Sequence, residues 1–480
     1  MVYRGRPSKS CRQCRKRDIK CDKKKDGCSQ CSRAGLSCPG YHNPKDLIIL
    51  DESDATIKRV SVNQTIRQSS SPNPLSIRLL PTVMQRAKGL YISQYVGAMP
   101  ATSIFCFMQI FYPPMIHDIP ILETVTRAVF MVNFSLSHGC HAALHHARAM
   151  YGSALRMTRK ALQIPDEVML DRTLFSVILM CVFERLASFE SDESVVPRSH
   201  LSGACELMSL RGTGQFADKY SPTMLLHLTE LVVLDCLARG SAIPLQLLSL
   251  RRMALDNAVD TSSLKWKFWD IMLRYVQLEN SVTSGHRSEE VILRAEQLDL
   301  ELEELACWLP AFVSRRQSPM PLNMSFAGTD IYPDCKSLTN WNNFRVVRLL
   351  LARIVREQGT RLPVSSADHT SLDNMLYESN RKAVDLTSDI LYSCSSEVLS
   401  SQQPCDLSLN TLLWHLYVAK TQELPLGHLE SSLHDQMLRL STIQAPGQRA
   451  TVKKILTSSA EDSRNVWRMW LKFGRNEFLI

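Results

Sequence analysis

Six cysteines near the start of the chain have the residue type and the spacing of metal ligands. They are Cys11, Cys14, Cys21, Cys28, Cys31 and Cys38, in the pattern C-x2-C-x6-C-x6-C-x2-C-x6-C. Each of the first three has an equivalent 17 positions later, so the segment duplicates one three-cysteine unit. A short turn brings both thiolates of a C-x2-C pair to one side of the chain, where they can bind one metal ion.

The number of thiolates predicts how zinc would be shared. Zinc prefers four ligands in a tetrahedron, so two ions need eight ligand positions and two of the six sulfurs must bridge. Pseudo-symmetry predicts that Cys11 and Cys28 are the bridges. One ion would bind Cys11, Cys14, Cys21 and Cys28, and the other Cys28, Cys31, Cys38 and Cys11. So small a segment lacks an apolar core, and metal binding should supply folding free energy on the order of 10 kcal/mol.

Two alternatives for the cysteines are a three-disulfide knot and unrelated free thiols. A knot needs an oxidising compartment, which nothing in the sequence indicates. The nine other cysteines are scattered between positions 106 and 405, at least eleven residues apart. Scattered cysteines are typically small buried hydrophobic residues, so we expect no metal site among them.

Charge distinguishes the two halves of the duplicated segment. The first half contains Arg12, Arg15, Lys16, Arg17 and Lys20, whereas the second contains only Arg33. We therefore expect the first half to face nucleic acid, with a short helix after Cys14 directed at a groove and residues 15–20 forming about one and a half turns. Lys23 and Lys24 should add attraction to phosphates.

The rest of the chain has a different charge balance. Residues 1–45 carry thirteen Lys and Arg against three acids, whereas residues 46–480 carry 43 basic and 44 acidic side chains. A basic head on a neutral body indicates that the head binds a polyanion. The N-terminus has no apolar stretch typical of a signal peptide, and no apolar run approaches the roughly 20 residues of a membrane span.

At this point residues 8–55 resemble the fungal binuclear zinc cluster transcription factors. The resemblance rests on the cysteine spacing and on matching positions Arg15, Arg17, Ile19, Lys20 and Asp22, with the run Cys38-Pro39-Gly40-Tyr41 and then Asp46-Leu47-Ile48. It implies two Zn²⁺ ions, and base contacts to a CGG triplet from basic residues at the third and fourth positions after the second cysteine.

Two positions depart from the pattern of that family. Arg17 is the third residue after Cys14 and is the candidate for base contact, but the fourth is Asp18. An acid there could accept a hydrogen bond from cytosine N4, cap the helix or pair with a neighbouring arginine. Asp26 stands where the family commonly has proline, followed by Gly27, so the loop between the halves should be less rigid.

Beyond the cluster, we expect a linker and one large all-α domain. We predict a DNA-binding module in residues 1–45, a linker in residues 46–80 that has no sustained heptad pattern, and a multi-helix domain in residues 81–480. Apolar residues recur with helical spacing over residues 144–162 and 174–186, and over the stretches 221–238, 262–281, 288–307, 338–357, 372–393, 409–420 and 449–472.

This large region resembles the fungal-specific regulatory domain that follows such clusters. The matching motifs are His200-Leu201-Ser202-Gly203-Ala204 and Trp341-Asn342-Asn343-Phe344-Arg345, with Leu413-Trp414. We expect these residues to be structural, with Gly203 and Ala204 allowing close helix packing. A role of the domain in sensing a small ligand is an alternative.

Enzyme motifs are missing, and we expect no catalytic activity. His138, His141, His145 and His146 lie at helical spacing and could bind a metal, but a polar helix face is the simpler interpretation. The competing functions are an enzyme with a zinc appendage and a zinc module that binds only proteins. The sequence favours a nuclear, sequence-specific regulator of RNA polymerase II genes that binds double-stranded DNA and the transcription machinery, and that binds DNA as a monomer or forms a homodimer through its helical domain.

Overall fold

The computed structural model describes most of the chain. The described residues are 9–41, 81–92, 119–188, 199–217, 220–285, 289–314, 330–362, 369–394, 406–422, 424, 428–443 and 463–473. Tertiary contacts divide the chain into one unit within residues 1–80, here called the cysteine unit, and a second within residues 81–480, the helical unit. The predicted linker, residues 46–80, lies outside the described residues.

Each half of the cysteine unit begins a short helix at a cysteine. Helix α1 spans Arg12–Lys16 and α2 spans Ser29–Arg33. The Sγ atom of Cys11 accepts a hydrogen bond from the N–H of Cys14 at 3.4 Å, and Cys28 does the same for Cys31 at 3.3 Å. The thiols therefore serve as N-caps, because they satisfy N–H groups that the first turn of a helix leaves without partners.

Both short helices also end in the same way. The N–H of Ile19 donates to the carbonyl of Cys14 at 3.1 Å, and the N–H of Leu36 donates to that of Cys31 at 2.9 Å. Between each helix and its closing bond lies a left-handed residue, Asp18 with φ 51° in the first half and Gly35 with φ 65° in the second. These are Schellman motifs, in which the left-handed position favours glycine.

One sequence prediction about this unit was wrong. We expected a helix after Cys14 that extends through Lys20, but α1 begins at Arg12, before Cys14, and ends at Lys16. Arg17 is its C-cap, and the left-handed conformation of Asp18 turns the chain out of the helix. The physical reason is that Cys14 and Cys21 must both return to the sulfur cluster, which a longer helix would prevent.

In its described residues, the helical unit is all-α apart from one short pair of strands, as the sequence predicted. Val313–Ser314 (β1) pairs antiparallel with Asp330–Ile331 (β2). Its described helices are α4 (Val83–Tyr91), α6 (Pro120–His138), α7 (His141–Ala161), α8 (Pro165–Val168), α9 (Asp171–Ala187), α10 (Ser199–Arg211), η4 (Thr213–Ala217), α11 (Ser221–Arg239), α12 (Leu245–Asp256), α13 (Leu264–Thr283), α14 (Glu289–Ala306), α15 (Cys335–Gly359), α16 (His369–Ser393), α18 (Asp406–Lys420), α19 (His428–Ile443) and α21 (Ser463–Phe473).

Helix boundaries follow ordinary start and stop chemistry. Pro120 is the first residue of α6 and Pro222 lies in the first turn of α11, where a missing N–H costs nothing. Gly139 and Gly240 follow these helices with φ 64° and 66°. A proline at the start and a left-handed glycine after the end therefore delimit both helices.

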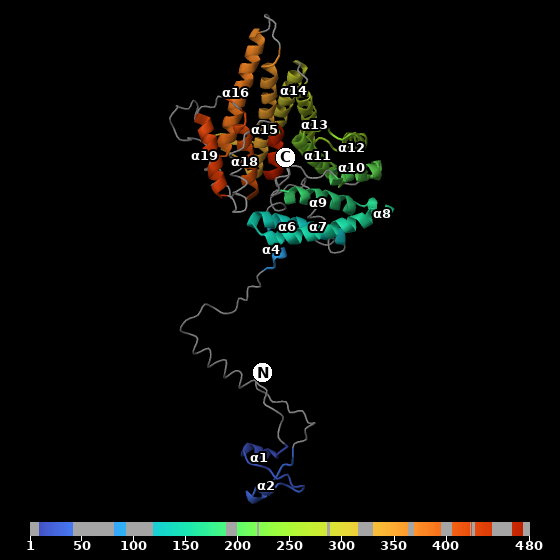
Figure 1. The fold of residues 1–480 in the computed structure, drawn as a ribbon, viewed down its shortest axis with the longest axis vertical. Helices are drawn as coiled ribbons and strands as arrows, with labels where there is room; N and C mark the ends of the chain where they lie inside the picture. Colours follow the sequence, from blue (N-terminus) through green and yellow to red (C-terminus); the bar gives the residue numbers. More distant parts are fainter. Residues whose placement is uncertain are drawn as a thin grey trace. The chain divides into compact units, whose positions relative to one another are not determined.

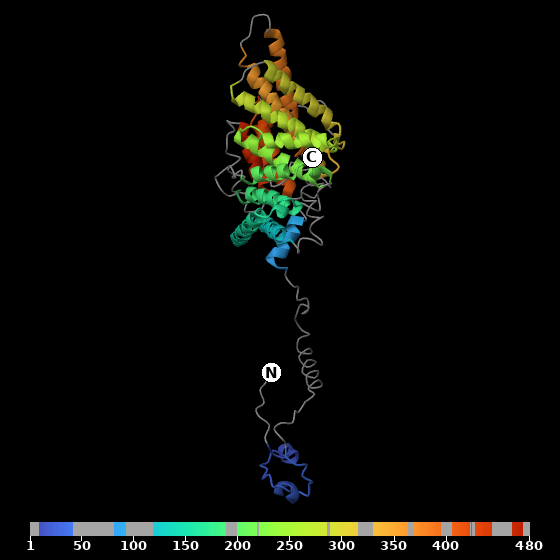
Figure 2. The same ribbon diagram turned by 90° about the vertical axis from the view of Figure 1, so that its right-hand side faces the viewer.

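The helices of this unit are arranged in two groups around one core. Helices α6, α7 and α9 pack together at one end, and α14, α15 and α16 pack together at the other (Figures 1 and 2). Helix α11 contacts α13 and α21 between them. The core therefore runs through the whole unit, and α7 and α16 lie at opposite ends of it.

Tryptophans from distant parts of the sequence form the centre of this core. Trp414 of α18 packs against Trp467 and Trp470 of α21, with ring centroids 5.7 and 4.6 Å apart and interplanar angles of 47° and 63°, and all three are buried. The indole N–H of Trp414 donates to the carbonyl of Val466 at 2.8 Å. Burial of three such side chains and the hydrogen bond fixes α21 on α18.

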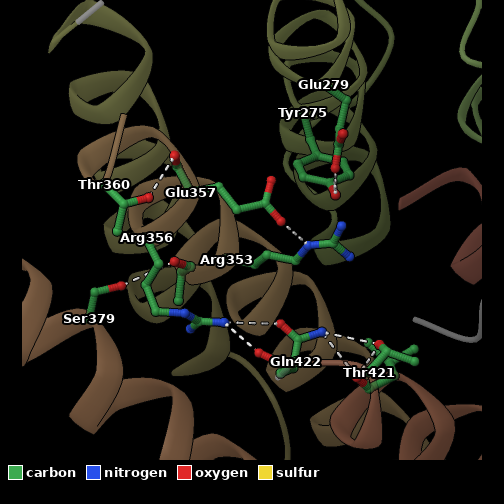
Figure 3. Close-up of polar contacts among 11 residues, drawn as sticks. Tyr275, Glu279, Arg353, Arg356, Glu357, Thr360, Ser379, Thr421 and Gln422 are labelled. Atoms are coloured by element: carbon green, nitrogen blue, oxygen red, sulfur yellow. Dashed lines mark hydrogen bonds and ion pairs between the residues drawn. The ribbon is translucent and has the colours of Figure 1, made fainter. Parts of the chain in front are cut away.

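Charged side chains inside the helical unit are held by polar partners. On α15, Arg353 donates to Glu357 at 2.5 Å, and Arg356 donates to the carbonyl of Gln422 at 3.3 Å, past the end of α18 (Figure 3). The amide of Gln422 is itself held by the carbonyl of Val418 at 3.0 Å. These contacts tie α15 to the end of α18, and burial lowers the pKa of Arg356 to about 10.

The motif containing Arg345 is structural, as expected. Its guanidinium donates to the Tyr332 hydroxyl at 2.7 Å and to the side chain of Asn342 at 3.0 Å. Asn342 in turn donates to Ser393 at 2.8 Å. The motif therefore joins α15 to Tyr332, just after β2, and to α16 through buried polar contacts.

The expectation about Gly203 was wrong. A Cβ atom at this position would meet nothing within 4 Å, so close helix packing does not require the glycine. Ala204 is fully buried, as expected for a small packing residue. His200 of the same motif contacts the Tyr151 hydroxyl at 2.9 Å and thereby links α10 to α7.

Most of the predicted helical stretches correspond to helices. The stretches at 144–162 and 174–186 are α7 and α9, and those from 221 to 420 match α11, α13, α14, α15, α16 and α18 to within a few residues. The last predicted stretch, 449–472, is described only from Ser463, where α21 begins. Of the described helices, α11 is long and apolar enough to span a membrane, and 83% of that stretch is buried in the helical unit.

The cysteines outside the cluster only partly follow the expectation of burial. Cys181, Cys205, Cys236 and Cys394 are buried, whereas Cys140 is half-buried and Cys307 is exposed. Cys106 and Cys405 lie outside the described residues. Burial raises the pKa of Cys205 to about 12, as it does for a thiol that behaves as a hydrophobic residue.

Candidate metal centre and nucleic-acid interface

The structure brings the sulfur atoms of all six clustered cysteines together. The Sγ atoms of Cys11, Cys14, Cys21 and Cys28 all lie within 4.8 Å of one another, and so do those of Cys11, Cys28, Cys31 and Cys38. Cys11 and Cys28 belong to both groups, and their sulfurs are 3.7 Å apart. The two shared sulfurs are thus the equivalent first cysteines of the two halves.

The sulfur separations fit tetrahedral zinc. A Zn–S bond of about 2.3 Å in a tetrahedron places two sulfurs roughly 3.8 Å apart. Cys11 and Cys31 are 3.6 Å apart, as are Cys14 and Cys28. These distances and an all-thiolate donor set are those of a structural zinc site, which has no open position for a substrate.

Burial and crowding control the protonation of these thiols. Burial raises the pKa of Cys14 far above its usual range, and the neighbouring Cys28 thiol, together with burial, raises that of Cys31 to about 12. Hydrogen bonds from the backbone of Cys28 and Gly40 lower the pKa of Cys38 to about 7. A cation must therefore displace protons from the buried thiols, so zinc binding and proton release are linked.

Two residues outside the cysteines support the cluster. The Asp22 carboxylate accepts the N–H of Ser29 at 3.1 and 3.3 Å, which joins the first half to the start of α2. Hydrogen bonds with the side chain and backbone of Ser29 lower the pKa of Asp22. Tyr41 packs against the sulfurs and donates its hydroxyl to the carbonyl of Lys24. In the sequence, both residues are recognisable only as positions that match the family pattern. Their hydrogen-bond partners follow from no local pattern, because only the folded loops bring the residues together.

The predicted nucleic-acid contacts lie on the surface around this sulfur core. The basic residues of the first half and its loop, together with Asp18, are all exposed; they are Arg12, Arg15, Lys16, Arg17, Lys20, Lys23 and Lys24. Within residues 9–41, none of these cations forms an ion pair with a carboxylate. Uncompensated cations on an exposed surface are available to phosphates and base edges.

The duplication allows the two halves to be compared position by position. The residues 17 positions after Arg15, Arg17 and Lys20 are Ser32, Ala34 and Ser37. Lys16 keeps its charge in the second half as Arg33, and Asp18 corresponds to Gly35. The same backbone therefore carries a cationic surface in one half and a nearly neutral one in the other.

The backbone explains Asp18 without a contact to another side chain. Asp18 occupies the left-handed position that ends α1, and aspartate tolerates that conformation better than most residues do. Lys23 is also left-handed, with φ 51°, and its equivalent is Gly40 with φ 82°. In the first half, both left-handed positions thus carry charged side chains where the second half has glycine.

The histidines near the start of α7 form no comparable site. His141, His145 and His146 are exposed, and His138 stacks on Phe134 with ring centroids 4.2 Å apart. Among the described residues, the only groups with metal-ligand geometry are the two that the six cysteines form. The structure therefore gives no support to the alternative of a histidine metal site.

Comparisons with known families agree with this geometry. Residues 9–47 match the model of the fungal Zn(2)-Cys(6) binuclear cluster domain, and residues 59–270 match that of the fungal specific transcription factor domain. Neither the comparison with curated proteins nor the comparison with solved structures found a match. The second match begins within the predicted linker and ends in α13, so it covers about the first half of the helical unit.

Proposed function

Because the chain combines a fungal Zn(2)-Cys(6) binuclear cluster domain with a fungal specific transcription factor domain and is thus a fungal Zn2Cys6 transcription factor, we propose that it regulates RNA polymerase II genes by binding CGG-like DNA sites. The observation that carries this proposal is the asymmetry of the duplicated unit. One scaffold of sulfurs and helices bears cations in its first half and almost none in its second. A purely structural zinc module has no need of that difference.

The metal centre of this proposal holds two Zn²⁺ ions. Cys11, Cys14, Cys21, Cys28, Cys31 and Cys38 are the ligands, and Cys11 and Cys28 bridge the ions. The two groups of four sulfurs with two shared members support this assignment. Zinc supplies the folding free energy of the module, and the chain supplies the charged surface that surrounds it.

DNA recognition is assigned to the first half. Arg17, at the end of α1, contacts a base edge in the major groove, and Arg12, Arg15, Lys16, Lys20, Lys23 and Lys24 contact phosphates or neighbouring bases. Asp18 lies beside Arg17 and modifies the preference for neighbouring bases. The exposure of all these side chains supports the assignment.

The remaining parts of the chain connect and regulate. We assign residues 1–45 to the DNA-binding module, residues 46–80 to a linker and residues 81–480 to the regulatory domain. The regulatory domain forms a homodimer and contacts the transcription machinery. The family implies a nuclear location, and transcription factors of such families are typically not enzymes.

A binding selection tests this function. Full-length, zinc-loaded protein is incubated with randomised duplex DNA, and the bound sequences are determined. Enrichment of a CGG-like triplet is expected. Protein that holds two zinc ions per chain but enriches no sequence would contradict DNA recognition and would point to a zinc module that binds proteins.

Two matched substitutions locate the contact. Arg17→Ala and Arg33→Ala each remove one exposed guanidinium from the end of a short helix. Arg17→Ala should weaken binding to the enriched site about ten-fold or more, the loss typical of a bidentate base contact. Arg33→Ala should change affinity less than about two-fold, and zinc content should stay constant in both variants. Equal effects of the two substitutions would contradict the assignment to the first half.

A further inference from the structure

A groove crosses the helical unit between α14 and α16. Both helices pack on α15 but make little contact with each other, and between them lies a cavity of about 650 Å³ that opens to solvent. Its floor is apolar and includes Leu351, Val355 and Leu386. Its walls carry the charged residues described below, and we call it the acidic groove.

The charges of the acidic groove are unbalanced. Its lining contains six carboxylates against Arg348, Arg381 and Lys382. The buried carboxylate of Asp299 accepts from Arg348 at 2.7 Å and from Lys382 at 2.6 Å, so these charges are satisfied within the groove. Glu303 pairs with Arg348, Glu378 with Arg381 and Asp389 with Arg345. Glu296 on α14 forms no ion pair with any described residue, and Asp385 on α16 interacts only with Arg381, which is already paired with Glu378. The groove therefore keeps an excess of carboxylates, with Glu296 on one wall and Asp385 on the other.

Exposed leucines extend the apolar surface beside this groove. Leu293 and Leu300 are 64% and 58% exposed on α14. They precede Glu296 and Glu303 by three residues each, so they lie next to these acids on the helix surface. The groove has an apolar floor and acidic walls, and exposed leucines lie beside it. These features suit a protein surface that carries basic side chains better than they suit a small molecule.

Helix α7, at the other end of the same unit, carries basic side chains of this kind. Residues 141–161 contain four Lys and Arg and no acid. Arg148, Arg156, Arg159 and Lys160 are all exposed, and none forms an ion pair with a described residue. Helical spacing places Arg148, Arg156 and Arg159 on one face, which we call the basic face. Its C-terminal end continues into exposed Leu162 and Ile164.

We propose that two copies of this chain pair through these surfaces, with the basic face of each α7 contacting the acidic groove of the partner. The inference deepens the proposed homodimer by naming its interface. Helix α7 lies at the opposite end of the helical unit from α14 and α16 (Figures 1 and 2). In the proposed dimer the two copies are antiparallel and related by a two-fold axis, so that both contacts form at once and the pair closes.

Charge complementarity favours a second copy over DNA as the occupant of the basic face. Outside residues 1–45 the chain has a net charge close to zero, so the helical unit does not attract a polyanion as a whole. The exposed cations of α7 and the excess of carboxylates in the groove are short-range features that match each other. The interface requires no bound DNA, and its test is independent of the selection experiment.

Charge reversal tests the pairing on the full-length, zinc-loaded protein without DNA. Sedimentation equilibrium gives the dissociation constant of the dimer for wild type, for R156E/R159E, for E296K/D385K and for the chain with all four substitutions. Each pair alone should raise the dissociation constant at least about ten-fold, because two like-charged groups then face each other at both contacts. The four together should restore it to within about three-fold of wild type.

Matched controls separate this interface from general charge effects. E304K/D373K reverses two exposed acids on the same two helices but outside the groove, and R252E/R361E reverses two exposed arginines outside α7. Both controls should leave the dissociation constant unchanged. A monomeric wild type, or a fourfold variant that stays as weak as the pairs, would overturn the proposal. So would a loss of DNA affinity in R156E/R159E with an unchanged dimer, which would assign the basic face to DNA.

Discussion

The cysteine unit and the helical unit are stabilised in opposite ways. In the cysteine unit, the described buried residues are sulfur ligands, and most other residues are exposed. In the helical unit, one core of aliphatic and aromatic side chains extends through the helices, and charged groups in it are mostly paired. Because metal ligands stabilise the cysteine unit, most of its side chains can be exposed and charged. The helical unit is stabilised by apolar burial, so only part of its residues remain on the surface for contacts.

Removal of zinc should produce the largest difference in stability between the two units. A strong chelator should unfold residues 9–41, because the metal contributes on the order of 10 kcal/mol to a module of this size. The thermal transition of the helical unit should not move. Calorimetry and circular dichroism of the full chain, with and without chelator, measure both effects. A downward shift of the helical transition on chelation would show that the two units depend on each other.

Truncation of a core tryptophan should have the reverse pattern. Trp414→Ala removes a fully buried ring that packs against Trp467 and Trp470, and should lower the free energy of unfolding of the helical unit by about 3–5 kcal/mol. Zinc content should stay the same. Trp308→Ala is the matched control, because Trp308 is 57% exposed, and it should cost less than about 1 kcal/mol. Denaturant titration measures both, and similar losses would contradict the central position of Trp414.

A smaller effect should appear within the cysteine unit at its first left-handed residue. Asp18→Gly copies Gly35 from the second half and removes the cost of a side chain at φ 51°. Resistance to chelator should rise by the equivalent of about 1 kcal/mol or less. Lys20→Gly is the control, because Lys20 is not left-handed, and it should not increase resistance. An unchanged or lower resistance of Asp18→Gly would indicate that the aspartate stabilises the turn.

The smallest effect concerns a surface ion pair of the helical unit and its dependence on pH. Arg274 donates to Glu301 at 2.8 Å and lowers the pKa of that carboxyl. A lowered pKa in the folded state stabilises the fold above the unfolded pKa of about 4.3, and this contribution is lost as the pH falls through the folded value. Glu301→Gln should therefore cost about 0.5 kcal/mol at pH 7 and nothing well below pH 4. Denaturant titrations at both pH values test this, and an equal loss at both would exclude ionisation as its source.

The spacing of the cysteines predicted how the sulfur atoms of the cysteine unit are grouped. The duplicated pattern led to two groups of four sulfurs with Cys11 and Cys28 shared, and the structure has that arrangement. The length of α1 was mispredicted because the pattern of basic residues suggested a longer helix. The glycine in the equivalent turn, Gly35, shows where the helix must end, and comparison of the two halves would have revealed it.

The helical unit was predictable in its elements and unpredictable in its packing. Apolar spacing located α7, α9 and most later helices, since that spacing depends only on neighbours along one helix. The packing of Trp414 against Trp467 and Trp470 joins residues more than 50 positions apart and follows from no local pattern. The acidic groove was missed for the same reason, because its walls come from α14 and α16 and meet only through α15.

The duplicated backbone of the cysteine unit also has a consequence for engineering. The second half already has the turns, caps and sulfur ligands of the first, and it lacks all but one of the cations. Substitutions S32R, A34R and S37K would copy the charged surface of the first half without altering a ligand. The resulting module would present two recognition surfaces around one metal core, and a single chain could then hold two DNA duplexes together.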